Sequence, residues 1–484
     1  MNKKDLKPES VFRFFSEINL IPRPSKHEEK MIEFLRKFGE ERGLETIVDT
    51  TGNVLIRKAA TPGMEQAPVI TLQSHMDMVC DKLVGKEINF LTDPIKTYVD
   101  GEWLTAEGTT LGADDGIGCA MELAILDADD IVHGPIECLF TVDEETGLTG
   151  ANNLDGSLLK GEMLINLDSE DEGLFYVSCA GGKTTTATYK YNKVEAPKDL
   201  FFLRATLDGL TGGHSGDDIN KKRANAAKIL ARFLYLEQEK RPLWLVSFNS
   251  GKLHNAIPRD GEIIFAVPFA DKEDVRADWN IFSSEVEEEF LVTEKNMHFH
   301  MESASCAPVI PQETSKRIIT ALQALHHGVF SVVQDLSLGN LTETSSNLAS
   351  VKTEDTEFTI VTSQRSSVMS NLTNMVNTIS AVFQLSGADS IVHNDGYPAW
   401  KMNPNSKIRE TAKECYIKLY GKEPTIIGIH AGLECGLFSE HYPHLDMLSI
   451  GPTMRGVHSP DERLLIPTVG KVFDLVVEIL KSIN

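Results

Sequence analysis

Short apolar runs alternate with amphipathic stretches through the first third of the chain. Apolar positions at helical spacing predict helices over 11–18, 26–42 and 116–127, with Ser10 as the N-cap of the first. The near-continuous apolar runs that predict buried strands are 53–57, 69–72, 136–142 and 163–167. This alternation indicates an α/β fold, a doubly wound and mostly parallel sheet whose ligand sites lie beyond the carboxyl ends of its strands.

The pattern changes after the glycine-rich stretch that begins at Gly181. From there the chain continues as strand–helix–strand units, and the helix and strand pattern of the first part returns only after about residue 396. A chain of 484 residues exceeds what one hydrophobic core usually supports, so two domains are expected. We therefore predict a catalytic domain formed by 1–183 and 395–484, with an inserted α+β lid domain over 184–394.

The insert contains a weak internal repeat. Asn255 and Asn347 each open a hairpin whose last strand leads into a helix. The two copies suggest that the lid domain is duplicated. The alternative, that any two hairpins look alike, stays open because two copies establish no sustained period.

Several histidine, aspartate and glutamate residues lie at or just after the ends of short apolar runs. Two imidazoles and three carboxylates in such positions are ligands suited to Zn²⁺ or Mn²⁺. One shared carboxylate would make a two-metal site, and a further carboxylate could act on a water molecule. Any one residue could be an ordinary solvated loop residue, but the recurrence weakens that alternative for the set. The candidates are His75, Asp77, Asp114, Asp115, Glu144, Glu145, Asp168 and His458.

Composition narrows the partners and the compartment. The formal net charge of −24 repels phosphate backbones and anionic membranes, which argues against nucleic acid and membrane partners. Residues 1–10 are charged and lack the apolar run of a secretory signal, and no segment is long enough to span a bilayer. Seven cysteines without a CxxC pair fit reduced thiols, with Cys119, Cys138 and Cys179 as core residues. We expect a cytoplasmic protein.

Four motifs occur in one order along the chain: Ser74-His-Met-Asp77, Leu111-Gly-Ala-Asp-Asp-Gly-Ile-Gly118, Asp143-Glu-Glu-Thr-Gly147 and Gly209-Leu-Thr-Gly-Gly-His-Ser-Gly216. With these motifs the chain resembles the co-catalytic zinc exopeptidases, the family that includes aminoacylase, peptidase T and carnosinase. Within that family it is most similar to the aminoacyl-histidine (Xaa-His) dipeptidases.

The resemblance implies two Zn²⁺ ions per chain, with Mn²⁺ or Co²⁺ as substitutes. His75 and Asp168 would bind one ion, Glu145 and His458 the other, and Asp114 would bridge them. It also implies a cis peptide bond after Asp114.

The remaining site residues follow from the same resemblance. Asp77 would orient the His75 ring, and Glu144 would be the general base that acts on a metal-bridging water. In the lid domain, His214, Asn255 and Arg365 match the substrate-contacting positions. His214 would stabilise the oxyanion, and Arg365 would bind the C-terminal carboxylate of a dipeptide.

The implied function is the hydrolysis of Xaa-His dipeptides in the cytoplasm, with the protein as a monomer or a homodimer. An aminopeptidase, a tripeptidase or an N-acyl amino acid amidohydrolase could use the same metal centre. A metal-bound scaffold protein with a dead site is a further alternative, but the presence of Glu144, which is needed only for proton transfer, argues against it.

Overall fold

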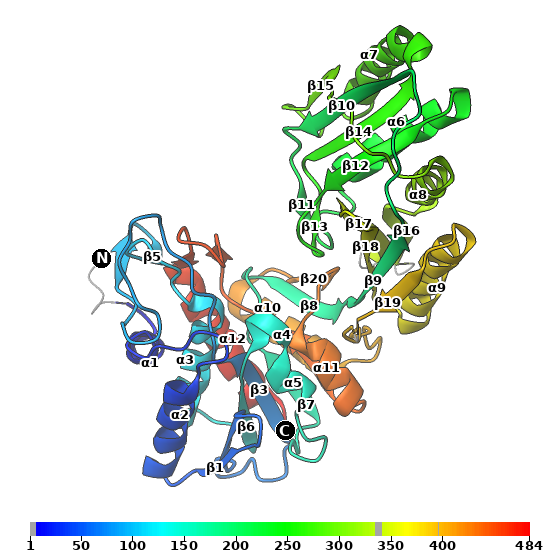
Figure 1. The fold of residues 1–484 in the computed structure, drawn as a ribbon. Helices are drawn as coiled ribbons and strands as arrows, with labels where there is room; N and C mark the ends of the chain where they lie inside the picture. Colours follow the sequence, from blue (N-terminus) through cyan, green and yellow to red (C-terminus); the bar gives the residue numbers. More distant parts are fainter. Residues whose placement is uncertain (1–5, 334–340, 395) are drawn as a thin grey trace. The chain divides into compact units, whose positions relative to one another are not determined.

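The computed structural model describes residues 6–333, 341–394 and 396–484 (Figure 1). The chain divides into two compact units. Unit 1 comprises Met1–Ser178, Trp400–Gly428 and Leu433–Asn484, and unit 2 comprises Cys179–Ala399 and Ile429–Gly432. Residue 395, where we expected the catalytic domain to resume after the insert, lies outside the described residues.

Unit 1 is built on an eight-stranded sheet with a parallel centre. Strand β3 is parallel to β6 and β7, and β21 is parallel to β7. On one side β1 and β2 pair antiparallel, and on the other β8 pairs antiparallel with β21. The order is β1 (Glu45–Val48), β2 (Val54–Lys58), β6 (Ile136–Thr141), β3 (Ile70–His75), β7 (Met163–Asn166), β21 (Asp446–Ser449), β8 (Leu174–Cys179) and β20 (Thr425–Ile429). The predicted α/β fold is confirmed.

Helices cover both faces of this sheet. Ser74 of β3 hydrogen-bonds Cys119 of α3 (Ala113–Asp127), whereas the adjacent Gln73 hydrogen-bonds Glu434 of α11 (Glu434–His441). Neighbouring residues of a strand point to opposite faces, so α3 and α11 lie on opposite sides of the sheet. The other helices of unit 1 are α1 (Glu9–Ile18), α2 (Glu29–Glu41), α4 (Glu144–Gly147), α5 (Thr149–Asn152), α10 (Lys407–Tyr420) and α12 (Ile466–Ser482).

A smaller four-stranded sheet also belongs to unit 1. Its order is β22 (Met454–Arg455), β23 (Arg463–Leu465), β5 (Trp103–Ala106) and β4 (Thr97–Asp100). Strand β22 precedes His458 by a short turn, so this sheet fixes the chain on both sides of that histidine.

One detail of the first helix was predicted wrongly. Helix α1 begins at Glu9, and its N-cap is Pro8 rather than Ser10. The Pro8 backbone is extended, and its carbonyl oxygen accepts the first helical hydrogen bond from the Phe12 amide. Ser10 therefore lies inside the first turn.

Cys119, Cys138 and Cys179 are buried, as predicted.

Unit 2 contains a nine-stranded sheet in which every described pairing is antiparallel. Its order is β15 (His298–Ser303), β10 (Leu200–Asp208), β14 (Gly261–Pro268), β12 (Trp244–Ser250), β17 (Thr342–Thr353), β18 (Glu357–Ser366), β9 (Gly181–Lys190) and β19 (Ser390–His393), and β16 (Gly328–Val332) pairs with β17. A short ribbon of β11 (Gly213–His214) and β13 (Ala256–Ile257) is separate.

Apart from β16, the nine-stranded sheet consists of two halves of four strands with the same topology. In chain order, β10, α6, β12, β14, α7 and β15 form one half, and β9, α8, β17, β18, α9 and β19 form the other. In each half the spatial order is fourth strand, first, third, second. The two second strands, β12 and β17, join the halves at the pair Ser250 and Val351.

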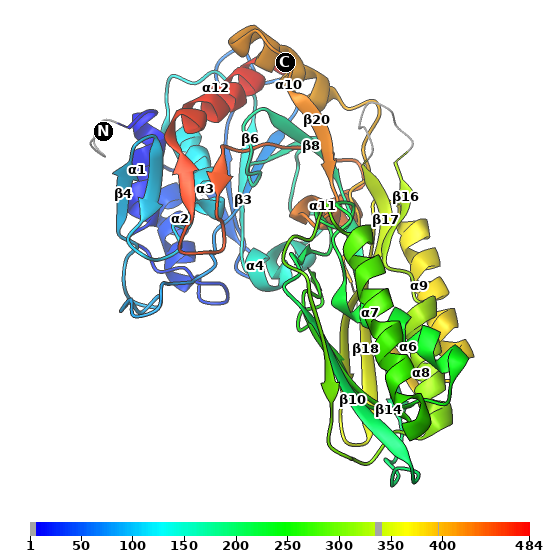
Figure 2. The same cartoon turned by 90° about the horizontal axis from the view of Figure 1, so that it is seen from above.

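The helices of unit 2 all cover one face of its sheet (Figure 2). They are α6 (Ala226–Lys240), α7 (Lys272–Glu289), α8 (Gln312–Ala324) and α9 (Met369–Leu385). Phe233 of α6 lies at the centre of this core, with its ring 4.8 Å from that of Trp279, 5.4 Å from that of Phe282 and 6.1 Å from that of Phe265. Aromatic packing of this kind adds to the stabilisation from apolar burial.

We predict that Phe233→Ala lowers the free energy of unfolding by about 3–5 kcal/mol, because a buried ring is lost and leaves a cavity. Urea denaturation followed by circular dichroism measures the change. Phe330→Ala is the control, since Phe330 is 52% exposed and its loss should cost less than about 1 kcal/mol. Equal losses for both variants would contradict this account of the unit 2 core.

Candidate functional site

Two imidazoles and three carboxylates of unit 1 converge at the carboxyl ends of the parallel strands. His75 Nε2 lies 3.1 Å from Asp114 Oδ1 and 3.4 Å from Asp168 Oδ1. His458 Nε2 lies 3.1 Å from Asp114 Oδ2 and 3.0 Å from Glu145 Oε2. The two oxygens of Asp114 thus face different imidazoles.

Strand register explains this convergence. In the parallel strands β3 and β6, His75 pairs with Thr141, so Glu144 and Glu145 follow the strand end beside His75. Asp168 comes two residues after β7, which is parallel to β3 on its other side. Parallel strands that end together place the residues that follow them in one region of space.

The segment that carries Asp114 is not regular helix at its start. Asp114 and Asp115 have non-helical φ and ψ angles within the first turn of α3, and the peptide bond between them is cis. The cis bond expected from the family resemblance is therefore present.

The spacing of the donor atoms suits divalent cations. A tetrahedral cation with bonds of about 2.1 Å has neighbouring ligands about 3.4 Å apart. The distances of 3.0–3.4 Å between the imidazole nitrogens and the carboxylate oxygens are close to this value. Nitrogen and oxygen donors in this combination are those that Zn²⁺ and Mn²⁺ accept.

The carboxylates of the cluster lie close together, and their negative charge affects how strongly its groups bind protons. Burial and then the other carboxylates raise the pKa of Asp168 and of Glu144 well above the usual range. Hydrogen bonds with Asp114 and Glu145 raise the pKa of His458 to about 11. Hydrogen bonds with His458 and then His75 lower the pKa of Asp114 despite its burial, so this carboxylate stays charged. Protons on the other groups offset part of the negative charge, and a cation that binds there would displace those protons.

Asp77 fixes the ring of His75 and the start of α4. Its Oδ1 lies 3.3 Å from His75 Nδ1, which is within ion-pair distance. The two groups are not aligned well enough for a regular hydrogen bond. Asp77 also accepts hydrogen bonds from Ser25 Oγ at 2.7 Å and from the backbone amides of Glu144 and Glu145 at 3.1 and 3.3 Å. With Nδ1 directed at Asp77, the Nε2 atom of His75 is left to face Asp114 and Asp168.

Arg23 was not identified from the sequence, because it lies in the connection between the helices predicted over 11–18 and 26–42. Its guanidinium is buried and donates hydrogen bonds to the carbonyl oxygens of Met76 at 3.1 Å, Asp77 at 2.7 Å and Gly112 at 2.5 Å. A Cβ atom on Gly112 would lie 2.6 Å from Arg23 Nη2 and could not be accommodated. Arg23 thus holds together the two segments that carry His75 and Asp114.

Glu462 is a second residue that the sequence did not indicate. Its buried carboxylate accepts hydrogen bonds from the consecutive backbone amides of Leu111 at 2.7 Å, Gly112 at 3.0 Å and Ala113 at 2.8 Å. Glu462 lies four residues after His458, so it ties the His458 loop to the segment that precedes Asp114. Only its closeness to His458 could have drawn attention to it.

Glu434, to which no role was assigned from the sequence, is buried among the central strands. It accepts hydrogen bonds from Gln73 Nε2 at 2.6 Å and Thr141 Oγ1 at 2.9 Å. Burial raises its pKa to about 7. Gln73 in turn accepts a hydrogen bond from Asn166 Nδ2 at 2.7 Å, so a buried polar chain crosses β6, β3 and β7.

The three candidate residues of the insert lie near one another in unit 2. His214 pairs with Ala256 in the β11–β13 ribbon, and the Ser215 amide donates to the Asn255 carbonyl oxygen at 2.8 Å. Arg365 in β18 places its Nη2 atom 3.3 Å from His214 Nε2. Asn255 is therefore close through its backbone, while the other two are close through their side chains.

Arg365 is a buried cation without an acidic partner. It is 6% exposed, and no carboxylate among the described residues lies within ion-pair distance of its guanidinium. Burial and then the charge of Arg365 lower the pKa of His430 to about 3 and also lower the pKa of His254. A hydrogen bond with His214 and then the charges of His214 and Arg365 lower the pKa of Asp217 despite its burial, so this carboxylate offsets the charge of Arg365 only from beyond ion-pair distance. A buried charge without a direct ion pair is costly, so this cluster of unit 2 can accept an anionic group.

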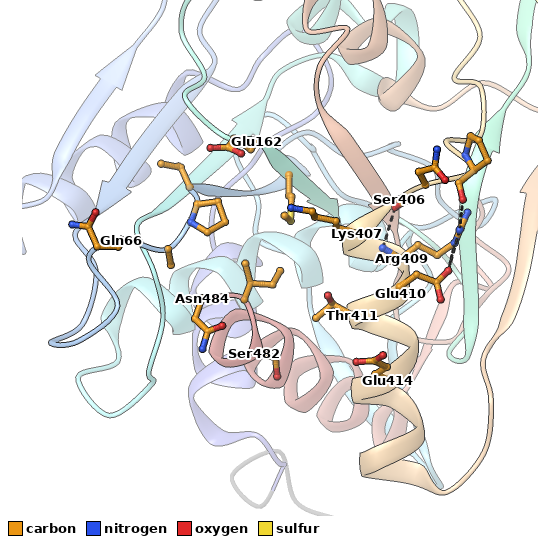
Figure 3. A pocket seen from close by; sticks show the side chains of 17 residues that line it. Gln66, Glu162, Ser406, Lys407, Arg409, Glu410, Thr411, Glu414, Ser482 and Asn484 are labelled. Atoms are coloured by element: carbon orange, nitrogen blue, oxygen red, sulfur yellow. Dashed lines mark hydrogen bonds and ion pairs between the residues drawn. The ribbon is translucent and has the colours of Figure 1, made fainter.

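A cavity of about 900 Å³ in unit 1 lies away from these ligands (Figure 3). It is lined by residues at or just before the amino ends of β3 and β7, including Val69 and Met163, by residues of α10, and by the chain from Ser482 to Asn484. The Arg409 side chain within it is already paired with Glu410. The cavity therefore does not belong to the predicted site.

Within the described ranges, no helix combines the length and the hydropathy that crossing a bilayer requires.

Three proteins that resemble this chain place it among known enzymes. The cytosol non-specific dipeptidase of Escherichia coli (strain K12) is 41% identical over 480 residues, which cover 99% of this chain and 98% of that protein. The crystal structure of aminoacylhistidine dipeptidase from Vibrio alginolyticus is 40% identical, with a TM-score of 0.92 over 100% of this chain and 98% of that one. Aminopeptidase PepT from Bacillus cereus, at 17% identity and a TM-score of 0.56 over 99% of each chain, shares the fold.

The model of peptidase family M20/M25/M40 matches residues 71–482. That range includes the sheet of unit 1 from β3 onward, all five of the converging imidazoles and carboxylates, and the whole of unit 2. The chain therefore belongs to peptidase family M20/M25/M40 and is a peptide-bond hydrolase.

Proposed function

We propose that the protein is a cytoplasmic dipeptidase that binds two divalent cations and hydrolyses Xaa-His and related dipeptides. The observation that carries the proposal is the position of Asp114, whose two carboxylate oxygens face separate imidazoles at 3.1 Å each. The names of the two relatives that match nearly the whole chain, a cytosol non-specific dipeptidase and an aminoacylhistidine dipeptidase, support the substrate class and the compartment.

The donor set supports a division of the ligands between two Zn²⁺ ions, with Mn²⁺ or Co²⁺ as substitutes. His75 and Asp168 would hold one ion, Glu145 and His458 the other, and Asp114 both. Such ions lower the pKa of a water molecule and polarise a carbonyl group.

Glu144 is our candidate for the general base. It follows β6 directly beside the ligand Glu145, and its pKa is raised well above the usual range by burial and then by Asp168 and Glu145. A carboxylate in this position can take a proton from the attacking water and deliver it to the amine that leaves. Asp77 assists by holding the His75 ring in place.

His214 is suited to donate a hydrogen bond to the carbonyl oxygen of the scissile bond. Its Nδ1 accepts hydrogen bonds from the amides of Gly216 at 3.4 Å and Asp217 at 3.2 Å, and it lies 3.6 Å from Asp217 Oδ2. On the strength of the two shorter amide contacts we assign the proton of the neutral ring to Nε2. Arg365 Nη2, another donor, lies 3.3 Å from this atom. Two donors that face each other need an acceptor between or beside them, and an anionic substrate group would supply it.

We assign the C-terminal carboxylate of the dipeptide to Arg365, and an additional substrate contact to Asn255. The planar guanidinium matches a carboxylate, and Arg365 has no acidic partner among the described residues. A site that requires a free carboxylate two residues from the start of the substrate would select dipeptides.

The substrate class can be tested with purified protein and a defined metal. We expect kcat/KM for Xaa-His and other dipeptides to exceed that for tripeptides and N-acyl amino acids by at least about 10-fold, because only dipeptides place a free amine and a carboxylate at the required separation. If N-acyl amino acids are hydrolysed fastest, the protein is an amidohydrolase of the same family. If tripeptides are fastest, it is a tripeptidase.

Glu144→Ala should keep both cations and lower kcat by at least about 100-fold, the scale of general acid–base catalysis. His458→Ala is the matched comparison, because it removes a proposed ligand and should lose one cation. Metal content measured by mass spectrometry on the same samples as kcat separates the two effects. Loss of metal from the Glu144 variant in step with its activity would show that Glu144 is a ligand.

The metal-stripped protein should become less stable as the pH rises from about 6 to about 9. The native state raises the pKa of His75, His458, Asp168 and Glu144, so between the unfolded and folded pKa values it binds more protons than the unfolded chain. The free energy of unfolding therefore falls with rising pH. For His458 the stabilisation is complete below about 6.5, the unfolded value, and is lost toward about 11.

Zinc-loaded protein serves as the control, because the cations replace those protons. Scanning fluorimetry across this pH range should show a falling Tm for the stripped protein and a nearly constant one for the loaded protein. A Tm of the stripped protein that rises with pH would mean that the cluster does not hold protons as described.

A further inference from the structure

Tyr397 of unit 2 is a direct partner of Arg365 that neither the sequence motifs nor the proposed roles include. Its hydroxyl oxygen accepts a hydrogen bond from Arg365 Nη1 at 2.6 Å, the shortest of the three described contacts of that guanidinium. The Arg365 Nε atom donates to Ser215 Oγ at 3.4 Å, and Nη2 faces His214. One side of the guanidinium is thus held by the phenol and the other is left beside His214.

The Tyr397 side chain can lie where it does because residue 182 of β9 is a glycine. Gly182 pairs with Arg365 of β18 on one side, and on the other it exchanges two backbone hydrogen bonds of 3.0 Å with Tyr397. A Cβ atom on Gly182 would lie 2.5 Å from both Cζ and the hydroxyl oxygen of Tyr397. The ring therefore passes over β9 at Gly182 and reaches Arg365 on the next strand.

A second glycine supports the ring. A Cβ atom on Gly432 would lie 2.7 Å from Cε2 of Tyr397. Both Gly182 and Gly432 are needed for the ring to lie where it does, so its position is fixed by the backbone of two separate segments of unit 2.

The chemistry of this partner matters for an anion site. Burial raises the pKa of the Tyr397 hydroxyl, so the group stays a neutral phenol at physiological pH. A carboxylate in its place would orient Arg365 but would also neutralise it. A neutral acceptor fixes the geometry of the guanidinium and leaves its charge available for a ligand.

We propose that Tyr397 is a positioning residue that enforces the requirement for a free C-terminal carboxylate, because it holds Arg365 in the orientation that receives this group. This inference rests on the proposed dipeptidase function and deepens it. It concerns substrate selection and not the chemical step, so its loss should change KM more than kcat.

The test compares a dipeptide with the same dipeptide amidated at its C-terminus, in zinc-loaded protein. Tyr397→Phe should raise KM for the free acid about 10-fold, as expected for a lost hydrogen bond to a charged group, with kcat within about twofold. The kcat/KM for the amide should not change. The ratio of the two kcat/KM values therefore falls about 10-fold.

Tyr189→Phe is the matched control. Tyr189 is a buried tyrosine of unit 2 that lies on β9, the strand whose Gly182 pairs with Tyr397. Its hydroxyl is 2.6 Å from Ser386 Oγ, a hydrogen bond of the same length as that between Tyr397 and Arg365. This variant loses a buried phenol hydrogen bond elsewhere, so the free-acid to amide ratio should remain that of the wild type.

Two further variants show whether Tyr397 acts through Arg365. Arg365→Met should abolish the preference for the free acid, and adding Tyr397→Phe to it should have no further effect on the ratio. Gly182→Ala should reproduce the effect of Tyr397→Phe, since its Cβ atom displaces the ring. Circular dichroism establishes whether each variant is folded. If Gly182→Ala does not fold, the result for Tyr397→Phe alone decides whether the inference holds.

The outcomes separate the two levels of the argument. If Arg365→Met abolishes the preference and Tyr397→Phe leaves it intact, the inference about Tyr397 is wrong and the proposed function stands. If Arg365→Met also leaves it intact, the assignment of the carboxylate to Arg365 fails, and the inference fails with it.

Discussion

Mutual repulsion between buried carboxylates is the constraint on which the rest of unit 1 depends. Asp114, Glu144, Glu145 and Asp168 meet near the ends of three neighbouring strands. Burial alone disfavours the charged forms of Asp114, Glu144 and Asp168. Such an arrangement is stable only when cations or protons offset the charge and the backbone holds the groups in place. Many of the contacts around the site serve that second purpose.

The backbone is held mainly by hydrogen bonds from a few buried charged groups. Arg23 binds carbonyl oxygens of two ligand-bearing segments, and Glu462 binds consecutive amides of one of them. One group is a cation that satisfies acceptors, and the other is an anion that satisfies donors. Together they join the N-terminal loop, the segment before Asp114 and the loop after His458, which are far apart in the sequence but meet at one site.

Much of the fold was predictable because its signals are local. Continuous apolar runs located the central strands, and residues such as His75 and Asp168 stood out because they follow those runs directly. Arg23, Glu462 and Tyr397 could not be found in this way. Their roles depend on which backbone groups lie nearby in space, and single-sequence patterns do not contain that information. The N-cap of α1 was misjudged because a proline carbonyl starts the helix two residues earlier than Ser10 indicated.

The domain boundaries and the duplication of the insert remain our proposals, although the common strand order of the two halves of unit 2 supports a duplication. That arrangement has a consequence for solubility. The 12-residue β17 pairs with β18 on one side and with β16 and β12 on the other. The described strands of this sheet that have a single neighbour are the shorter β15, β16 and β19, with six, five and four residues. Long unpaired edges recruit strands from other molecules, whereas short ones offer few hydrogen-bonding groups. Joining two copies of one unit in this way leaves little surface on which the sheet could grow into an aggregate.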